Sequence, residues 1–262
     1  MLRIAVPSKG RLMQDTFQWF GARGVGMAQS GAEREYAGTV QGLAGGAELV
    51  LMAAGEIPQA LAAGQVHLGV TGSDLVEDRL PDWQRQVASL ARLGFGQADL
   101  IVAVPVVWVD VASLDDLDAV AAQFRATHGR RLRIATKYHR LVRDFLTAEG
   151  VADYCLVDSQ GATEGTVKQQ VAECIADITS SGDTLRANHL KPLVDGLVHA
   201  SEATLYAART APWPEADLAA LAMLAKATGL VVPHDLGAGE PDGRDIDGPP
   251  KIDGAAQAAR LE

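Results

Sequence analysis

Short β-type runs alternate with amphipathic helical patterns along most of this 262-residue chain. Residues 2–6 form the first β-type run, and the helix spacing of Met13, Phe17 and Phe20 follows it and ends near Gly21. The alternation recurs in four further pairs of segments: residues 48–52 with 57–63, 66–70 with 73–78, 132–135 with 138–149, and 174–178 with a helix from about Gly182. Strands that alternate with helices predict an α/β fold with mainly parallel sheets.

The run from Leu100 to Val109 is apolar on both faces, which predicts a central strand. It contains Pro105 and is too short to span a bilayer, and the N-terminus turns polar too soon for a signal peptide. We therefore expect a cytoplasmic protein without a membrane segment. Cys155 and Cys174 lack the spacing of a metal site and are predicted to be buried thiols.

The charge balance argues against one class of partner. The formal net charge is −10, whereas general nucleic-acid binding needs a basic surface that displaces counterions. We therefore expect no nucleic-acid partner. An anionic substrate would need a local basic site or a site built from backbone amides.

The end of the chain differs in composition from the rest. Between Pro233 and Gly254, 14 of 22 residues are Pro, Gly or Asp, which predicts a disordered tail. A helix from about residue 215 to 228 precedes the tail, and its apolar residues are predicted to dock on the body of the protein or on a partner: Leu218, Leu221, Ala222 and Ala225.

The segment from Asp177 to Arg186 carries the clearest chemical signal. A β-type run leads into a turn rich in hydroxyl groups and glycine, and then into a helix. Such a turn can point backbone N–H groups and hydroxyls at a phosphate, while Asp177 could accept hydrogen bonds from sugar hydroxyls. A phosphorylated sugar fits this combination. The alternative is an ordinary Ser/Thr cap at a strand–helix junction, and local chemistry favours the two readings equally.

Extended upstream to Glu164, this segment resembles the signature of the ATP phosphoribosyltransferase family. The matching positions are Glu164, Ala172, Ile175, Asp177, Ile178, Ser181, Gly182, Thr184 and Leu185. Four other stretches match in order: residues 7–12 (PSKGRL), 68–75 (LGVTGSDL), 93–96 (LGFG) and 133–138 (RIATKY). Three departures stand out: Gln170 replaces a usual Gly, residues 53–58 lack a common Arg, and residues 97–99 supply no basic residue.

The resemblance implies a two-lobed fold like that of type II periplasmic binding proteins, with a cleft between the lobes. Lobe I would contain residues 1–95 and 180–211, lobe II residues 96–179, and residues 212–262 the helix and tail. It also implies a reaction that joins N1 of ATP to C1 of phosphoribosyl pyrophosphate and releases pyrophosphate, as the first step of histidine biosynthesis. This displacement needs positioning and charge stabilisation more than a strong nucleophile.

The resemblance also implies roles for individual residues. Asp177 and Glu164 would be catalytic, either binding the ribose hydroxyls or favouring positive charge at C1. Lys9 and Arg11 would meet the pyrophosphate or triphosphate, unless they are a solvated surface pair. The ribose 5-phosphate would be held by Ser180, Ser181, Gly182, Asp183, Thr184 and Leu185.

Three further residues are candidates for the nucleotide pocket. Lys137 and Tyr138 follow a predicted strand, but an exposed Lys and a packed Tyr fit the same pattern. Asp74 either faces the cleft or caps a helix. Mg²⁺ is implied by the two polyphosphates and would be bound mainly through them, so no protein residue is assigned as a metal ligand.

Two alternatives and one partner complete the sequence-based hypothesis. A non-catalytic two-lobed solute-binding or sensing protein could share the fold, and a phosphoribosyltransferase could use another acceptor base. The residues after Ala211 do not suggest the histidine-binding domain of the family's long form. The chain therefore resembles the short form, which implies a homo-oligomer that works with a regulatory subunit similar to histidyl-tRNA synthetase.

Overall fold

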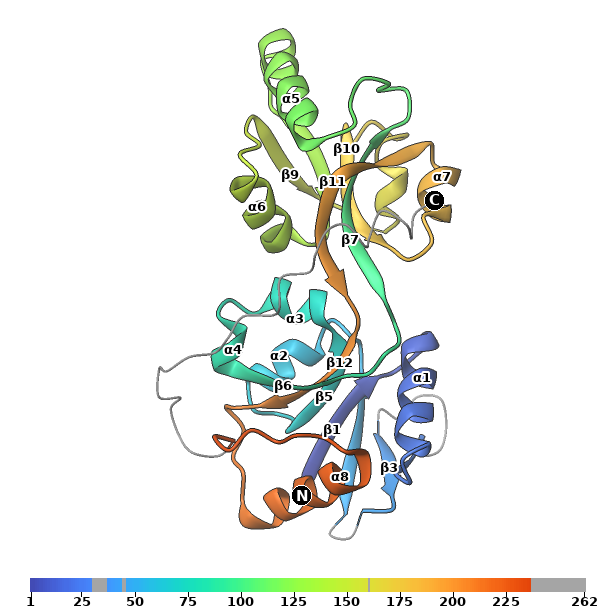
Figure 1. Ribbon diagram of the computed structural model, residues 1–262, viewed down its shortest axis with the longest axis vertical. Helices are drawn as coiled ribbons and strands as arrows, with labels where there is room; N and C mark the ends of the chain where they lie inside the picture. The colour runs from blue at the N-terminus through green and yellow to red at the C-terminus, as the bar shows by residue number, and fades with distance from the viewer. Residues whose placement is uncertain (30–36, 44–45, 160, 237–262) are drawn as a thin grey trace. The chain divides into compact units, whose positions relative to one another are not determined.

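The computed structural model describes residues 1–29, 37–43, 46–159 and 161–236. They form two compact units, each built around its own sheet (Figure 1). Unit 1 contains Met1–Gln97 and the described chain from Glu202 onward, and unit 2 contains the described residues of Ala98–Ser201. The sequence resemblance predicts that residues 180–211 belong to the first lobe. The structure instead keeps residues 180–201 in unit 2, because a strand formed there pairs within that unit.

Unit 1 contains a sheet in the order β2-β3-β4-β1-β5-β12-β6. Strand β1 lies between β4 and β5 and runs parallel to both, while the remaining neighbours pair antiparallel. The strands are β1 (Leu2–Pro7), β2 (Gly26–Gln29), β3 (Ala37–Gln41), β4 (Ala47–Met52), β5 (Leu68–Gly72), β6 (Val87–Arg92) and β12 (Ala203–Ala208).

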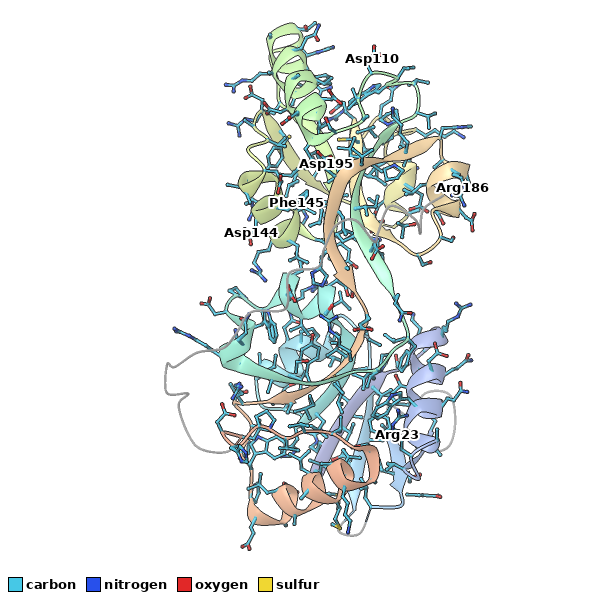
Figure 2. All side chains as sticks on the ribbon, in the orientation of Figure 1. Arg23, Asp110, Asp144, Phe145, Arg186 and Asp195 are labelled. Carbon is cyan, nitrogen blue, oxygen red and sulfur yellow. The ribbon has the colours of Figure 1, made fainter. Side chains whose placement is uncertain are left out.

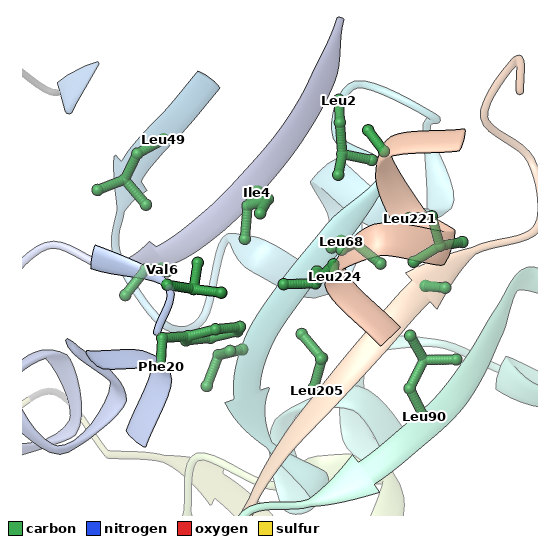
Figure 3. Packing of buried hydrophobic residues seen from close by; sticks show 14 of the residues in the cluster. Leu2, Ile4, Val6, Phe20, Leu49, Leu68, Leu90, Leu205, Leu221 and Leu224 are labelled. Atoms are coloured by element: carbon green, nitrogen blue, oxygen red, sulfur yellow. The ribbon is translucent and has the colours of Figure 1, made fainter. Parts of the chain in front are cut away.

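Helices cover both faces of this sheet because successive side chains of a strand point to opposite sides. Leu2, Ile4 and Val6 of β1 face a core that includes residues of α1 (Gly10–Gly21) and α8 (Glu215–Thr228) (Figure 3). Ala5 faces a second core. That core is filled from α2 (Ile57–Ala62), α3 (Ser73–Arg79) and α4 (Trp83–Gln86).

Unit 2 contains a sheet in the order β11-β7-β10-β8-β9. Strands β10, β8 and β9 run parallel, and β7 pairs antiparallel with β10 and β11. The strands are β7 (Ala98–Pro105), β8 (Leu132–Thr136), β9 (Tyr154–Asp158), β10 (Cys174–Thr179) and β11 (Leu190–Ser201). The helices are α5 (Leu114–His128), α6 (His139–Ala148), the 3₁₀ turn η1 (Thr163–Gly165) and α7 (Asp183–Ala187).

The predicted α/β class is confirmed, but the prediction of mainly parallel sheets is wrong. Both sheets are mixed, because β12 returns beside β5 and β6 in the opposite direction and β7 runs opposite to β10. The predicted central strand is confirmed only up to Pro105. Beyond it, Val107 and Val109 are 77% and 78% exposed, since the strand ends at the proline.

The predicted C-terminal helix is confirmed, although a different face is buried. Ala220, Leu221 and Leu224 pack into unit 1, whereas Leu218 and Ala222 are exposed. The buried face is shifted because Asp217 is also buried and forms an ion pair with the N-terminal amine of Met1. The predicted disordered tail lies mostly outside the described residues. Its described beginning includes Leu236, which is buried in unit 1.

None of the helices in the described ranges is long and apolar enough to cross a bilayer. Of the two cysteines predicted to be buried, Cys174 is buried and Cys155 is partly exposed, and both are free thiols. Burial also raises the pKa of the Cys174 thiol far above its usual range.

Candidate functional site

Three parallel strands of unit 2 end at the same edge of its sheet. Thr136 of β8 pairs with Asp158 at the end of β9 and with Ala176 of β10. Lys137 comes directly after Thr136, and Asp177 comes directly after Ala176. The two residues therefore lie at the same level of the sheet. Ligands of open α/β sheets bind outside the carboxyl ends of parallel strands, so this edge is the first place to look for a site.

The loop from Ser180 to Gly182 joins the end of β10 to α7 at this edge. Gly182 has φ of 72°, which a residue with a side chain rarely adopts. A Cβ atom there would lie 3.1 Å from a guanidinium nitrogen of Arg186. The glycine thus lets the chain turn sharply and brings the start of α7 next to the loop. Its N–H donates to Oγ1 of Thr179 at 3.0 Å.

Ser181, Asp183 and Arg186 form a connected polar cluster. The Ser181 hydroxyl donates to one carboxylate oxygen of Asp183 at 2.7 Å, and Arg186 donates to the other at 2.6 Å. Arg186 also donates to the Ser181 carbonyl at 3.1 Å. The hydrogen bonds from Ser181 and Arg186 lower the pKa of Asp183. The carboxylate is therefore held in its charged form.

The other predicted phosphate-binding residues lie in the same place. Ser180 and Thr184 are exposed, and in the part of the chain that the structure describes their hydroxyls have no hydrogen-bond partner. Leu185 is buried in the core of unit 2 and anchors the short helix α7 against the sheet. The loop therefore presents hydroxyl groups to solvent from a fixed base.

Asp177 and Glu164 come from different segments that meet in unit 2. Asp177 is partly exposed on β10, and one of its carboxylate oxygens accepts the N–H of Ile178 at 2.9 Å. Glu164 lies on η1, which packs against β10. The η1 turn is fixed by buried hydroxyl contacts, since Ser159 and Thr163 share a hydrogen bond of 2.8 Å.

The two nucleotide-pocket candidates after β8 differ in exposure. Lys137 is exposed, and its ammonium donates to the carbonyl of Gly161 at 2.6 Å, which ties the loop before η1 to β8. Tyr138 is buried, with 7% exposure, and its N–H donates to Oγ1 of Thr136.

Unit 1 holds the remaining three candidates. Lys9 and Arg11 are exposed, one just after β1 and one at the start of α1. Asp74 is buried in the first turn of α3, directly after β5. Because β1 and β5 are parallel, these residues also follow carboxyl ends of strands at one sheet edge. They belong to a different unit from the loop of β10.

Sequence reasoning gave no role to Arg186. It is the only basic residue between Asp177 and the end of α7. A lone basic residue directly after a predicted phosphate-binding loop was the sequence signal that could have identified it. Among the described residues, no three His, Cys, Asp or Glu side chains are grouped so that they could hold a metal ion.

Comparisons with known proteins identify the family. A family model described as ATP phosphoribosyltransferase (HisG) matches residues 53–226. The ATP phosphoribosyltransferase of Cereibacter sphaeroides is 68% identical over 235 residues, covering 90% of this chain and 99% of its own length. The enzyme of a Bradyrhizobium species is 48% identical over 214 residues, covering 82% of this chain and 66% of the relative.

A solved structure agrees with the fold. A chain of the ATP phosphoribosyl transferase (HisG:HisZ) complex from Thermotoga maritima matches with a TM-score of 0.62 and 17% identity, covering 87% of this chain and 98% of that one. The matches in sequence and the motif around Gly182 lead to one assignment. The chain belongs to the ATP phosphoribosyltransferase family, the transferases that catalyse the first step of histidine biosynthesis.

Proposed function

We propose that the chain transfers the phosphoribosyl group of phosphoribosyl pyrophosphate to N1 of ATP, and that the loop after β10 binds the ribose 5-phosphate. The observation that carries this proposal is the set of groups at the loop: the exposed residues Ser180 and Thr184 flank Gly182 in sequence, and the Arg186 guanidinium lies beside Gly182 and the Ser181 carbonyl. Hydroxyl and guanidinium groups are strong hydrogen-bond donors to phosphate.

The two carboxylates fit the other end of the ribose. In the transfer, the bond from C1 to the pyrophosphate oxygen breaks with its electron pair, and the N1 lone pair of adenine forms the new bond to C1. Positive charge develops on the ribose between these events. Asp177 and Glu164 would bind the ribose hydroxyls and favour that charge, and neither residue needs to accept a proton from N1 for the bond to form.

Each unit contains candidate residues for the nucleotide or the polyphosphates. Lys9 and Arg11 are exposed cations suited to pyrophosphate or triphosphate oxygens. Lys137, Tyr138 and Asp74 are the candidates for the nucleotide pocket, although Tyr138 and Asp74 are largely buried. Mg²⁺ would neutralise the clustered phosphates. A metal held mainly by substrate oxygens needs few protein ligands.

We also propose that the chain self-associates in the cytoplasm and works with a regulatory subunit similar to histidyl-tRNA synthetase. The support is the Thermotoga structure, which is described as a HisG:HisZ complex and has the fold of this chain. The partner would be a HisZ-like protein.

A spectroscopic assay tests the reaction directly. The chain, with a HisZ-like protein added, is mixed with ATP, Mg²⁺ and phosphoribosyl pyrophosphate, and the ultraviolet spectrum and pyrophosphate release are followed. Alkylation of adenine N1 changes the chromophore, so we expect a new absorbance that grows with pyrophosphate. Pyrophosphate release only with another base would favour a different acceptor. Substrate binding without any turnover would favour the non-catalytic binding protein.

A further inference from the structure

Four donors at the loop after β10 are already bound by acceptors of the loop itself. The N–H of Gly182 donates to the Thr179 hydroxyl, and the N–H of Asp183 donates to the Ser181 hydroxyl at 3.4 Å. The Ser181 hydroxyl and the Arg186 guanidinium both donate to the Asp183 carboxylate. A phosphate can meet the hydroxyls of Ser180 and Thr184, which are free among the described residues, but to bind Ser181 and Arg186 it must replace the acceptor that these two residues already have.

We propose that the Asp183 carboxylate is a placeholder acceptor: it keeps Ser181 and Arg186 in position, and the ribose 5-phosphate takes over these two donors when it binds. This inference rests on the proposed function, since it assigns the loop to the 5-phosphate. It makes Asp183 a positioning residue that competes with the substrate, whereas the sequence analysis counted it among the binding residues.

The geometry of the cluster favours such an exchange. A carboxylate and a phosphate offer similar oxygen pairs to a guanidinium fork, so Arg186 can bind either group. The phosphate carries the larger negative charge, about −1.5 to −2 near neutral pH. Both members of the ion pair are exposed, with 77% of the Asp183 side chain and 62% of the Arg186 side chain accessible to solvent. An exposed ion pair is weak, so the carboxylate can move into water at little cost.

The loop needs Asp183 only while the phosphate is away. Once the phosphate is bound, the carboxylate is a like charge next to it and opposes binding. Removing the charge of Asp183 should therefore increase the affinity for the phosphate, whereas removing a residue that only stabilises the loop would decrease it. The two roles predict changes of opposite sign.

The test measures binding of phosphoribosyl pyrophosphate to the full chain by calorimetry in the presence of Mg²⁺. We expect Asp183→Asn to tighten binding about three- to tenfold at low ionic strength. The gain should shrink as salt screens the repulsion. Asp110→Asn is the matched control, because it removes one negative charge elsewhere in unit 2. Figure 2 places Asp110 in the loop after β7, away from Arg186 on α7. The affinity of this variant for phosphoribosyl pyrophosphate should stay within about twofold of the wild-type value.

A second pair of variants tests whether the effect passes through Arg186. Arg186→Gln should weaken binding, because the guanidinium is the donor that the phosphate gains. In a chain that already carries Arg186→Gln, Asp183→Asn should increase the affinity much less, because there is no guanidinium left for the carboxylate to bind. In steady-state kinetics, Asp183→Asn alone should lower the KM for phosphoribosyl pyrophosphate while kcat changes less.

Three results would overturn the proposal. Weaker or unchanged binding by both Asp183→Asn and Asp183→Ala would reject the placeholder role. If Gly182→Val, which disturbs the loop itself, then also weakens binding, the phosphate site stays in place. An equal increase in affinity from Asp110→Asn would show that the effect of Asp183→Asn comes from the net charge of the protein and not from the loop. Binding that responds to none of the loop variants would reject the site itself. Circular dichroism of each variant establishes that it is folded.

Discussion

Asp177 is the residue on which the proposed chemistry depends most. Its position on β10 is set by the strand register, and its carboxylate already accepts the N–H of Ile178. A second acidic residue, Glu164, lies on the separate η1 turn, which packs against β10. Two negative charges near C1 of the ribose would stabilise a transition state that carries positive charge.

Replacement of Asp177 by Asn separates charge from shape. If the carboxylate favours the positively charged ribose, kcat should fall more than the affinity for phosphoribosyl pyrophosphate falls. Steady-state kinetics combined with direct binding measurements distinguish the two quantities. Equal losses in turnover and affinity would restrict Asp177 to binding the ribose.

Gly182 and Thr184 test the loop as a phosphate site. Gly182→Val places a β-branched residue at φ of 72° and a Cβ atom 3.1 Å from Arg186, so phosphoribosyl pyrophosphate binding should weaken sharply while the fold is retained. Thr184→Ala removes one donor, and the rate should fall roughly 10²-fold if that contact tightens in the transition state. Thr184→Ser keeps the hydroxyl and should retain most activity. Wild-type kinetics in both Gly182→Val and Thr184→Ala would show that the loop only caps α7.

At the scale of elements, an ion cluster joins the beginning of β10 to β8. Glu173 accepts hydrogen bonds from the guanidinium groups of Arg133 and Arg130 and from the backbone N–H of Arg133. Burial alone would raise the pKa of Glu173, but these hydrogen bonds together outweigh it and lower the pKa to about 2. The strand that carries Asp177 is thus held at its other end by a charged group.

This cluster makes stability depend on acid pH. Because the folded-state pKa of Glu173 lies below its ordinary value of 4.5, its contribution is complete above about pH 4.5 and is lost as the pH falls toward 2. Glu173→Gln should be less stable than wild type near neutral pH by about 1–2 kcal/mol, after allowance for partial exposure, and the difference should shrink below pH 4. Urea unfolding at several pH values measures it. Glu149→Gln, at an exposed position, is the control. A stability difference between Glu173→Gln and wild type that does not change with pH would contradict this role of Glu173.

The elements predicted well from sequence are those whose pattern is local. The helix spacing of Met13, Phe17 and Phe20 requires only the periodicity of one segment, and α1 is confirmed. The direction of β12 and β7 in the sheets depends on pairing between distant segments, which periodicity does not report. The buried face of α8 was misplaced for the same reason, since the buried Asp217 has its ion-pair partners, Met1 and His67, in distant parts of the sequence.

In the candidate site, the residue types were predictable but their pairing was not. The hydroxyls and Gly182 follow from the strand–turn–helix pattern. The Asp183 carboxylate accepts hydrogen bonds from Ser181 and Arg186. This pairing depends on the directions of the side chains in the folded loop, which the sequence pattern does not contain.

For the whole molecule, the proposed partnership predicts how regulation is distributed. The chain alone should self-associate and should be insensitive to histidine, and sensitivity should appear when a HisZ-like partner is added. Activity assays with and without the partner, together with size-exclusion chromatography, measure this. Inhibition of the purified chain alone by physiological histidine would contradict the proposal and would require an effector site within the chain.

Unit 1 is assembled from both ends of the described chain, and this has a consequence for synthesis on the ribosome. Strand β12 lies inside its sheet, between β5 and β6, although about a hundred residues of unit 2 separate it from them in sequence. During translation, β5 and β6 emerge long before their shared neighbour, so their inner edges stay unpaired while unit 2 is being made. In the part of the chain that the structure describes, unit 2 is a single stretch, Ala98–Ser201, and can fold before β12 is made. The nascent first hundred residues therefore expose two unpaired strand edges, the kind of surface that chaperones protect from aggregation.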